Sequence, residues 1–360
     1  MTEGPAPCEV SWFSALCDDD YEFLGVPDPK LVSSFEHCRT IALAAEAGGF
    51  DNLLLPSGYA LGIDSIAFAA GMAPMLKRMR LLAAIRCGEM WPPQLARQLA
   101  SLNKMLDGRL TINIISSDLP GEALASAPRY RRTVEVMHIL AALMSGEPVD
   151  IDGEFYRFKL EPPRLLQGAT RRPPFYFGGL SEDAREAAAE AADVYLMWPD
   201  RMDVVRGIVS DLSARAEKRG RKLKFGYRVH VVVRESEAEA RLAAERLLSR
   251  LDDAEGTRIR ERSLDSGSYG VRRQAELRDM ASADGYAEDN LWTGIGRARS
   301  GCGAAIVGDP DQVVAKLNAY RAIGIDAFIL SGYPHAAEAD LVARHILPRL
   351  DHGPLGALAG

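Results

Sequence analysis

The chain has 360 residues, of which 47% are hydrophobic and 26% charged, ordinary values for a folded globular protein that exclude fibrous and wholly disordered classes. The 43 basic and 50 acidic residues leave a formal net charge of −7 without a basic stripe, so nucleic acid is not expected as a partner. The five cysteines lack a C-x-x-C motif, and because residues 1–13 show no basic region followed by an apolar stretch, we expect no signal sequence. No apolar run reaches the length of a membrane span, so we expect a cytoplasmic protein without membrane contact.

Short β-type runs alternate with longer helical patterns along most of the chain, which indicates βαβ units around a parallel sheet. Eight strands are predicted, at about 10–14, 52–55, 81–85, 110–115, 175–177, 194–197, 225–233 and 327–331. Helices are predicted at 33–48, 64–76, 94–106, 131–144, 182–192, 202–219, 236–251 and in the last segment, ending near 350. Eight such units, without a glycine-rich dinucleotide turn after the first strand, favour a (β/α)8 TIM barrel over a doubly wound sheet. We expect one barrel domain over residues 1–360.

A segment rich in Arg, Asp, Glu, Ser and Gly, residues 252–308, separates the seventh unit from the last strand. Loops of this length within a compact domain are usually functional or disordered. Its position at the catalytic end of the barrel favours a lid or mobile segment that closes over a ligand. A solvated surface excursion is the alternative.

Two side chains that carry or can carry charge are predicted to share one face of the seventh strand. Arg228 and His230 lie two residues apart, and side chains at this spacing point to the same side of a strand. A buried guanidinium beside an imidazole is costly unless an anion or another acceptor meets them. The pair is therefore a candidate anion-binding site, with a structural ion pair to a neighbouring carboxylate as the alternative.

Two further groups are expected at the barrel mouth, where the loops after the strands converge. The segment Gly294–Gly303 combines four glycines with Arg297 and Arg299. Glycine lets such a loop hinge, and arginine supplies a forked, charged donor for a sulfonate, phosphate or carboxylate. The alternative is a surface loop with solvated charges. Tyr333 and His335 directly follow the last strand and either serve the site or simply pack there.

A strand that runs into a glycine turn and a helix start predicts a phosphate site at Gly178–Ser181. Backbone N–H groups and the Ser181 hydroxyl can hold a phosphate there, aided by the helix dipole. Alternatively, Ser181 is only a helix N-cap, with Glu182 beginning the first turn. Trp198 follows the sixth strand and either lines a ligand-binding pocket or packs in the core. No cluster has metal-ligand spacing, and no metal is expected.

Several segments resemble the FMNH2-dependent alkanesulfonate monooxygenases of the bacterial luciferase-like superfamily. They are KFGYRVHVVVRE, NLWTGIGRARSGCGAAIVGDP, GIDAFILSGYPH, YFGGLSEDA and VYLMWPD. The resemblance implies the barrel fold and a two-component reaction, in which a separate flavin reductase delivers reduced FMN. With oxygen, the enzyme then cleaves the carbon–sulfur bond of an organosulfonate to give sulfite and an aldehyde. We also expect a homo-oligomer, either a dimer or a tetramer.

The same resemblance implies roles for individual residues. The implied catalytic residues are Arg228, His230, Arg299 and Tyr333. Trp198, Arg228, His230 and Arg299 are the implied substrate-binding residues. The residues implied to hold FMN are Asn113, Tyr130, Gly179, Leu180 and Ser181.

The segments SWFSALCDDDYEFLG and LLLPSGYALGID are similar to the branch of this family that acts on sulfoquinovose, a sulfonated glucose, to give 6-oxo-glucose. The chain departs from the wider family in two places. Pro56–Asp64 lacks a cysteine, and Asn113–Ser117 replaces a Thr-Gly. The acidic loop Asp18–Asp20 offers acceptors for sugar hydroxyls or is simply solvated. The alternatives are an alkanesulfonate or methanesulfonate monooxygenase, another luciferase-like flavin monooxygenase, and a non-catalytic flavin-binding barrel.

Overall fold

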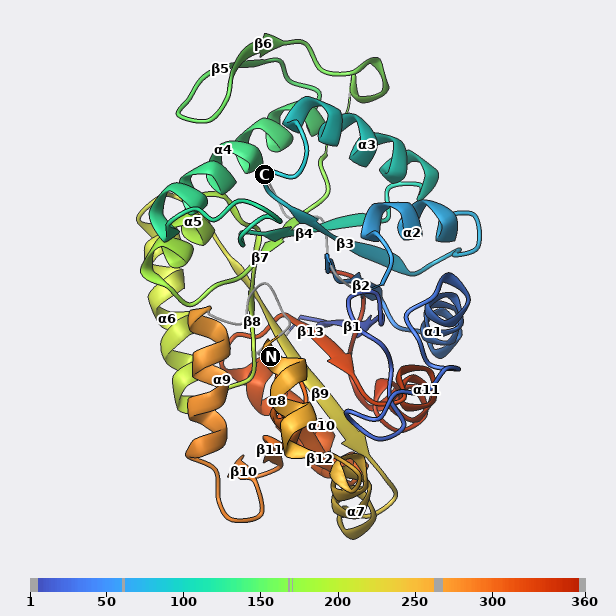
Figure 1. Ribbon diagram of the computed structural model, residues 1–360. Helices are drawn as coiled ribbons and strands as arrows, with labels where there is room; N and C mark the ends of the chain where they lie inside the picture. The colour runs from blue at the N-terminus through green and yellow to red at the C-terminus, as the bar shows by residue number, and fades with distance from the viewer. Residues whose placement is uncertain (1–5, 60–61, 168, 170, 262–267, 356–360) are drawn as a thin grey trace, which may run out of the picture.

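Eight parallel strands close into a barrel surrounded by helices in the computed structural model (Figure 1), which describes residues 6–59, 62–167, 169, 171–261 and 268–355. The strands pair in the order β9, β13, β1, β2, β3, β4, β7, β8, and β8 pairs again with β9. Their bounds are β1 (Glu9–Phe13), β2 (Asn52–Leu55), β3 (Arg80–Arg86), β4 (Leu110–Ile115), β7 (Phe175–Phe177), β8 (Val194–Met197), β9 (Lys224–Val233) and β13 (Ala327–Ser331). The predicted TIM barrel and its eight strands are thereby confirmed.

The helices that cover the barrel follow the expected alternation with the strands. They are α1 (Phe35–Gly48), α2 (Ser65–Met72), α3 (Pro92–Met105), α4 (Ser126–Met144), α5 (Glu182–Ala191), α6 (Met202–Glu217), α7 (Glu237–Leu248), α10 (Pro310–Ala322) and α11 (His335–His345), with η3 (Leu347–Arg349) after it. Helix α4 begins earlier than predicted because Pro128 falls in its first turn, where a missing N–H breaks no helical bond. Helix α10 was not predicted, although Asp309 and Gln312 form a capping box around Pro310 at its start.

Alternate residues of each strand point into the barrel, and the interior is filled rather than hollow. Phe13, Leu54, Leu82, Tyr176 and Ile329 belong to the interior cluster. At the end where the strands begin, the buried Glu9 carboxylate accepts hydrogen bonds from the Tyr176 hydroxyl at 2.7 Å and from the Leu355 backbone N–H at 3.2 Å. Burial raises the pKa of Glu9 despite these donors. This polar layer and Leu355 fill that end of the barrel, so the open mouth is where the strands end.

The inserted segment 252–308 folds against one side of the barrel. It contains α8 (Asp253–Glu261), α9 (Tyr269–Asp279), β10 (Tyr286–Glu288), β11 (Leu291–Trp292), η2 (Gly294–Arg297) and β12 (Ala305–Gly308). Strand β12 pairs in parallel with the second half of β9, with Ala305 opposite His230. The long strand β9 therefore belongs both to the barrel and to the added sheet.

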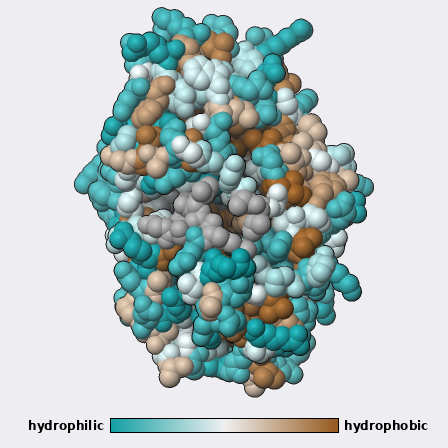
Figure 2. Space-filling model, in the orientation of Figure 1, coloured by the Kyte–Doolittle hydropathy of each residue, from teal (hydrophilic) through white to brown (hydrophobic). Residues whose placement is uncertain are grey.

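A two-stranded hairpin stands outside the barrel. Strands β5 (Val149–Asp152) and β6 (Arg157–Leu160) pair only with each other and precede η1 (Arg164–Leu166). In Figure 1 the hairpin lies beyond α3 and α4, at the end of the molecule opposite to α7. In the same view, Figure 2 shows a mostly hydrophilic surface with apolar side chains in small separate patches. No helix in the described part of the chain is long and apolar enough to cross a membrane.

Candidate functional site

Two arginines from distant parts of the chain converge on one aromatic ring at the barrel mouth. The guanidinium carbon of Arg228, on β9, lies 4.4 Å from the centroid of the Phe13 ring, and that of Arg299 lies 5.2 Å from the same centroid. The two guanidinium carbons are therefore less than about 10 Å apart. Phe13, at the end of β1, was not predicted as a site residue, because a single apolar residue in a strand gives no functional signal.

Both guanidinium groups keep buried donors that bond to no other described residue. Arg228 is 3% exposed, and its Nη1 donates to the carbonyls of Val229 at 3.0 Å and Ile329 at 3.4 Å. Arg228 Nη2 and Arg299 Nε have no hydrogen-bond partner among the described residues. Buried donors of a charged group are costly unless a ligand accepts them. The carboxylate partner considered as an alternative for Arg228 is not found in the described part of the chain.

His230 lies beside Arg228 on the same strand and is fully buried. Its Nδ1 is 2.7 Å from the Ser331 hydroxyl, while its Nε2 has no partner among the residues described. Burial lowers the pKa of His230 well below 6.5, and the positive charges of Arg228 and Arg299 lower it further. The ring is therefore neutral at physiological pH.

The depressed pKa of His230 predicts a pH-dependent stability for the ligand-free protein. Because the folded-state pKa lies below the ordinary value of 6.5, folding favours the neutral ring. This stabilisation is complete above pH 6.5 and is lost as the pH falls below it. Between pH 7.5 and 5.5, wild type should lose more of its free energy of unfolding than His230→Gln, by up to about 1.4 kcal/mol, the limit for a ring that stays neutral in the folded protein. Urea unfolding at both pH values measures the difference, and equal losses would contradict the prediction.

Tyr333 connects the two sides of this cluster. Its hydroxyl accepts a hydrogen bond from Arg299 Nη1 at 2.5 Å, and its ring stacks on His230 with the centroids 5.3 Å apart. Burial raises the pKa of the phenol, although the nearby Arg299 charge opposes this, so the hydroxyl keeps its proton. The structure thus brings together Arg228, His230, Arg299 and Tyr333, the four predicted catalytic residues.

Trp198 follows β8 and packs against the inserted segment. A Cβ atom added to Gly270 would lie 2.9 Å from the indole ring, and one added to Gly301 would lie 3.2 Å from it. Gly301 has a φ of 87°, which favours glycine for a second reason. The tryptophan therefore contacts the loop that carries Arg299, two residues before Gly301.

A buried carboxylate fixes the chain around Tyr333, and this function was not predicted for it. Asp20 accepts hydrogen bonds from the His335 backbone N–H at 2.9 Å, from His335 Nδ1 at 2.7 Å and from His37 Nε2 at 3.0 Å. Burial opposes its ionisation, but these partners hold the pKa of Asp20 below 3.8. For Asp20 the interpretation as a solvated loop residue is wrong, because its carboxylate is buried and hydrogen-bonded inside the protein, while contact of the acidic loop with sugar hydroxyls stays a prediction.

The predicted FMN residues come from β4, from α4 and from the turn after β7. An added Cβ on Gly179 would lie 3.2 Å from the Tyr130 hydroxyl and 2.6 Å from the Ala184 side chain, so only glycine fits there. Ser181 caps α5, since its Oγ accepts from the Ala184 N–H at 3.3 Å. The half-buried Asn113 is in register with Tyr176 of the adjacent strand β7.

The turn before α5 fits a phosphate group. The cap leaves the Ser181 O–H free to donate, and the first N–H groups of the helix have no intrahelical partner. The two acids of the first turn are engaged elsewhere, because Glu182 pairs with Arg215 and Asp183 accepts from the Ser126 hydroxyl at 2.6 Å. The N-cap and the phosphate interpretations of Ser181 are therefore compatible.

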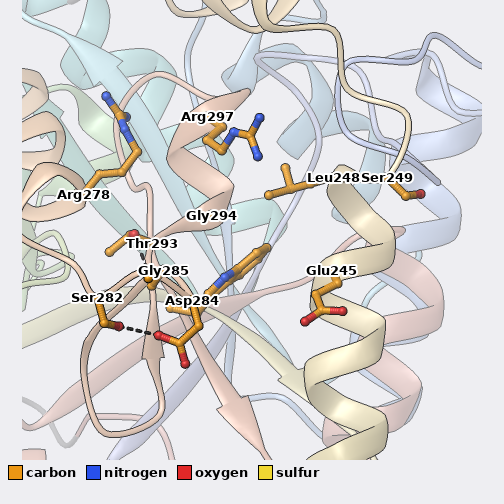
Figure 3. A pocket seen from close by; sticks show the side chains of 12 residues that line it. Glu245, Leu248, Ser249, Arg278, Ser282, Asp284, Gly285, Thr293, Gly294 and Arg297 are labelled. Atoms are coloured by element: carbon orange, nitrogen blue, oxygen red, sulfur yellow. Dashed lines mark hydrogen bonds between the residues drawn. The ribbon is translucent and has the colours of Figure 1, made fainter.

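A separate pocket of about 440 Å³ lies on the outer side of the inserted segment (Figure 3). Figure 3 shows Glu245 and Leu248 of α7 on one side of it and Thr293 and Gly294 on the other. Gly294 and Arg297 of the predicted Gly294–Gly303 loop line this pocket, but none of the residues implied to be catalytic, substrate-binding or FMN-binding does. Among the described residues, no group of His, Cys, Asp and Glu is arranged to hold a metal ion.

Comparisons with known proteins agree with this architecture. The model of the luciferase-like monooxygenase family matches residues 23–327, and the chain belongs to this family. It is 64% identical to a sulfoquinovose monooxygenase of Novosphingobium aromaticivorans, over 97% of this chain and 98% of that protein. It is 54% identical to a sulfoquinovose monooxygenase of Agrobacterium fabrum, over 95% of this chain and 89% of that protein. The fold is shared with a riboflavin lyase solved with modified FMN and riboflavin. The two structures superpose with a TM-score of 0.76 over 98% of this chain and 94% of that chain, at 16% sequence identity.

Proposed function

We propose that the chain is a two-component, FMNH2- and O2-dependent monooxygenase that cleaves the carbon–sulfur bond of sulfoquinovose. The sulfonate, reduced FMN and dioxygen give 6-oxo-glucose, sulfite, oxidised FMN and water, so that one oxygen atom enters the aldehyde and the other enters water. The observation that carries the proposal is the pair of unpartnered buried donors on Arg228 and Arg299, whose guanidinium groups both lie over Phe13. The sugar skeleton is inferred from the two similar proteins that are named for it.

The two arginines are suited to the head group of a sulfonate. A sulfonate keeps its charge throughout the physiological pH range, and its three oxygens match the forked donors of guanidinium groups. Because the site is largely buried, these charge-assisted hydrogen bonds meet little competition from water. Arg228 Nη2 and Arg299 Nε are the donors available for the anion.

His230 and Tyr333 have complementary parts in this proposal. With Ser331 donating to Nδ1, the neutral imidazole carries its proton on Nε2 and donates it to a sulfonate oxygen. The protonated hydroxyl of Tyr333 is held by Arg299 and can donate at the reacting carbon–sulfur group. Trp198 lines the substrate pocket where the Arg299 loop meets the barrel.

The residues Asn113, Tyr130, Gly179, Leu180 and Ser181 would hold FMN, with the phosphate at the turn before α5. Reduced FMN supplies the electrons that activate dioxygen. Residues 252–308 form a lid whose Arg299 loop excludes water when substrate is bound. A separate flavin reductase supplies the reduced cofactor, the protein works as a dimer or tetramer, and its location is cytoplasmic.

A sulfite assay tests the function. The protein is supplied with a flavin reductase, NADH, FMN and oxygen, and sulfite is measured with sulfoquinovose, methanesulfonate or octanesulfonate as substrate. We expect sulfite with sulfoquinovose at a kcat/KM at least about tenfold above the other two. A higher kcat/KM for methanesulfonate or octanesulfonate would mean that an alkanesulfonate, rather than sulfoquinovose, is the substrate. The absence of sulfite with all three compounds would reject the proposed function.

Replacing Ser181 by alanine should weaken the binding of FMN about tenfold, because a charge-assisted hydrogen bond to the phosphate is lost. The binding of riboflavin, which has no phosphate, should not change. Fluorescence titration with both ligands measures the effect. Ser34→Ala is the matched control, since Ser34 caps α1 in the same way, outside the site. Equal weakening for FMN and riboflavin would contradict a phosphate site at this turn.

A further inference from the structure

A third arginine reaches the barrel mouth on the wall opposite to Arg228. Arg86 is the last residue of β3 and lies on its inward-facing side. The alternation along this strand fixes that orientation, because Leu82 belongs to the interior cluster and Arg80 donates to the carbonyl of the interior residue Leu355 at 2.9 Å. Three strands separate β3 from β9 in either direction around the barrel.

The guanidinium of Arg86 is buried, and part of its hydrogen-bonding capacity is not used within the described part of the chain. The residue is 4% exposed, and neither Nε nor Nη1 has a hydrogen-bond partner there. Nε lies 3.2 Å from a carboxylate oxygen of Glu89, whose side chain is 42% exposed, so the ion pair reaches the solvent-accessible rim. Nη1 is therefore an unused donor on a buried cation, which indicates a position that can receive an acceptor from a ligand.

The two other anionic groups expected at the mouth already have partners. Arg228 and Arg299 are assigned to the sulfonate, and the turn Gly179–Ser181 to the phosphate of FMN. That turn follows β7, which lies two strands from β3, about 10 Å along the wall. The sugar hydroxyls of the proposed substrate are neutral, whereas the ring of reduced FMN can carry a negative charge, so the ring is the further group at the mouth that a buried cation such as Arg86 would favour.

We propose that Arg86 binds the N1 and C2-carbonyl edge of the flavin ring and favours reduced FMN over oxidised FMN; this inference rests on the proposed function. Reduced flavin loses its N1 proton near neutral pH, and the negative charge is shared between N1 and the C2 oxygen, whereas the oxidised ring is neutral. A guanidinium fork can donate to both atoms of that edge. Positive charge near N1 is a recognised way for a protein to tune a flavin. A protein that takes its reduced cofactor from solution gains selectivity for it in this way.

Anaerobic fluorescence titrations of Arg86→Gln test the proposal without an activity assay. We expect the affinity for reduced FMN to fall ten- to hundredfold and that for oxidised FMN to change by less than about threefold. Each tenfold change in the ratio of the two affinities shifts the two-electron potential of bound FMN by about 30 mV, here to more negative values. Arg97→Gln, which removes an exposed positive charge from α3, should change neither affinity.

The outcomes separate the possible positions of the arginine. Equal weakening for reduced and oxidised FMN, with riboflavin binding unchanged, would place Arg86 at the phosphate and overturn the proposal. Unchanged affinities for both redox forms would also overturn it. Failure of wild type to bind FMN in either form would overturn the proposed function and this role with it.

A second measurement keeps the proposal testable if Arg86→Gln does not fold. Reduced riboflavin carries no phosphate, so the pH dependence of its binding reports on N1. We expect wild type and Arg86→Lys to bind it more tightly as the pH rises from 6 to 8 and N1 loses its proton. A flat profile for wild type would contradict a cation at N1.

Discussion

Replacing Arg299 by alanine should lower kcat/KM for sulfoquinovose by about 30-fold to several thousandfold, which corresponds to about 2–5 kcal/mol of lost transition-state binding. The change removes one of the two charged donors above Phe13 and leaves the substrate anion paired with Arg228 alone. The Tyr333 hydroxyl also loses the donor that holds it at 2.5 Å. Initial rates of sulfite release measure the effect.

Two further variants show which function of Arg299 is lost. Tyr333→Phe keeps the guanidinium but removes the hydroxyl, so it should retain the affinity for sulfonate and lower kcat. Arg297→Ala is the matched control, because Arg297 lies two residues away, pairs with Asp253 and has a side chain that is 45% exposed. Its activity should stay within about twofold of wild type. If Arg299→Ala had the same kcat/KM as wild type, Arg299 would not be part of the substrate-binding site.

Replacing Asp20 by alanine should lower the free energy of unfolding by about 3–5 kcal/mol. The substitution removes the acceptor for His37 Nε2 and for the ring and backbone N–H groups of His335, which are left buried without it. Because Asp20 has a folded-state pKa below 3.8, its stabilisation is present above pH 3.8 and is lost as the pH falls. Urea unfolding at pH 7.5 measures the loss.

Controls for Asp20 separate charge from shape. Asp20→Asn keeps one oxygen acceptor at the same place and should lose less stability than Asp20→Ala. Asp28→Ala removes a carboxylate that caps only the backbone N–H of Lys30 at an exposed turn, and it should cost about 1 kcal/mol or less. A loss of that small size for Asp20→Ala would show that its hydrogen bonds are not coupled to folding.

The barrel strands could be predicted because their apolar runs are separated by long helical patterns and by turn residues. The bounds of β2, β4, β7, β8 and β13 agree with the sequence prediction. Strands β5, β6 and β10–β12 were missed because they lie outside the regular alternation of strand and helix, which revealed the equally short β2, β7 and β8. Helices α8 and α9 were also missed, because each buries only two residues and therefore shows almost no apolar stripe.

The candidate site was predictable only where spacing along one strand determines direction. Arg228 and His230 could be paired because they share a face of β9. The position of Phe13 between two arginines depends on closure of the barrel, which brings β1 beside β13. Arg86 was missed because the predicted third strand ended at residue 85, one residue too early.

Partners far apart in the chain explain the remaining errors. The acceptor role of Asp20 could not be predicted, because its partner His335 is 315 residues away. Composition alone placed this carboxylate in a polar loop, whereas the folded chain buries it beneath the end of the last strand.

The register between β12 and β9 limits how far the Arg299 guanidinium can travel. Ala305 is hydrogen-bonded into the sheet opposite His230, and the N–H of Gly296 donates to the Gly303 carbonyl at 2.8 Å. These hydrogen bonds fix the backbone a few residues before and after Arg299, so only a short part of the large insertion around this residue is free to move. Residues 297–302 are therefore the part of the insertion that could rearrange without breaking these hydrogen bonds.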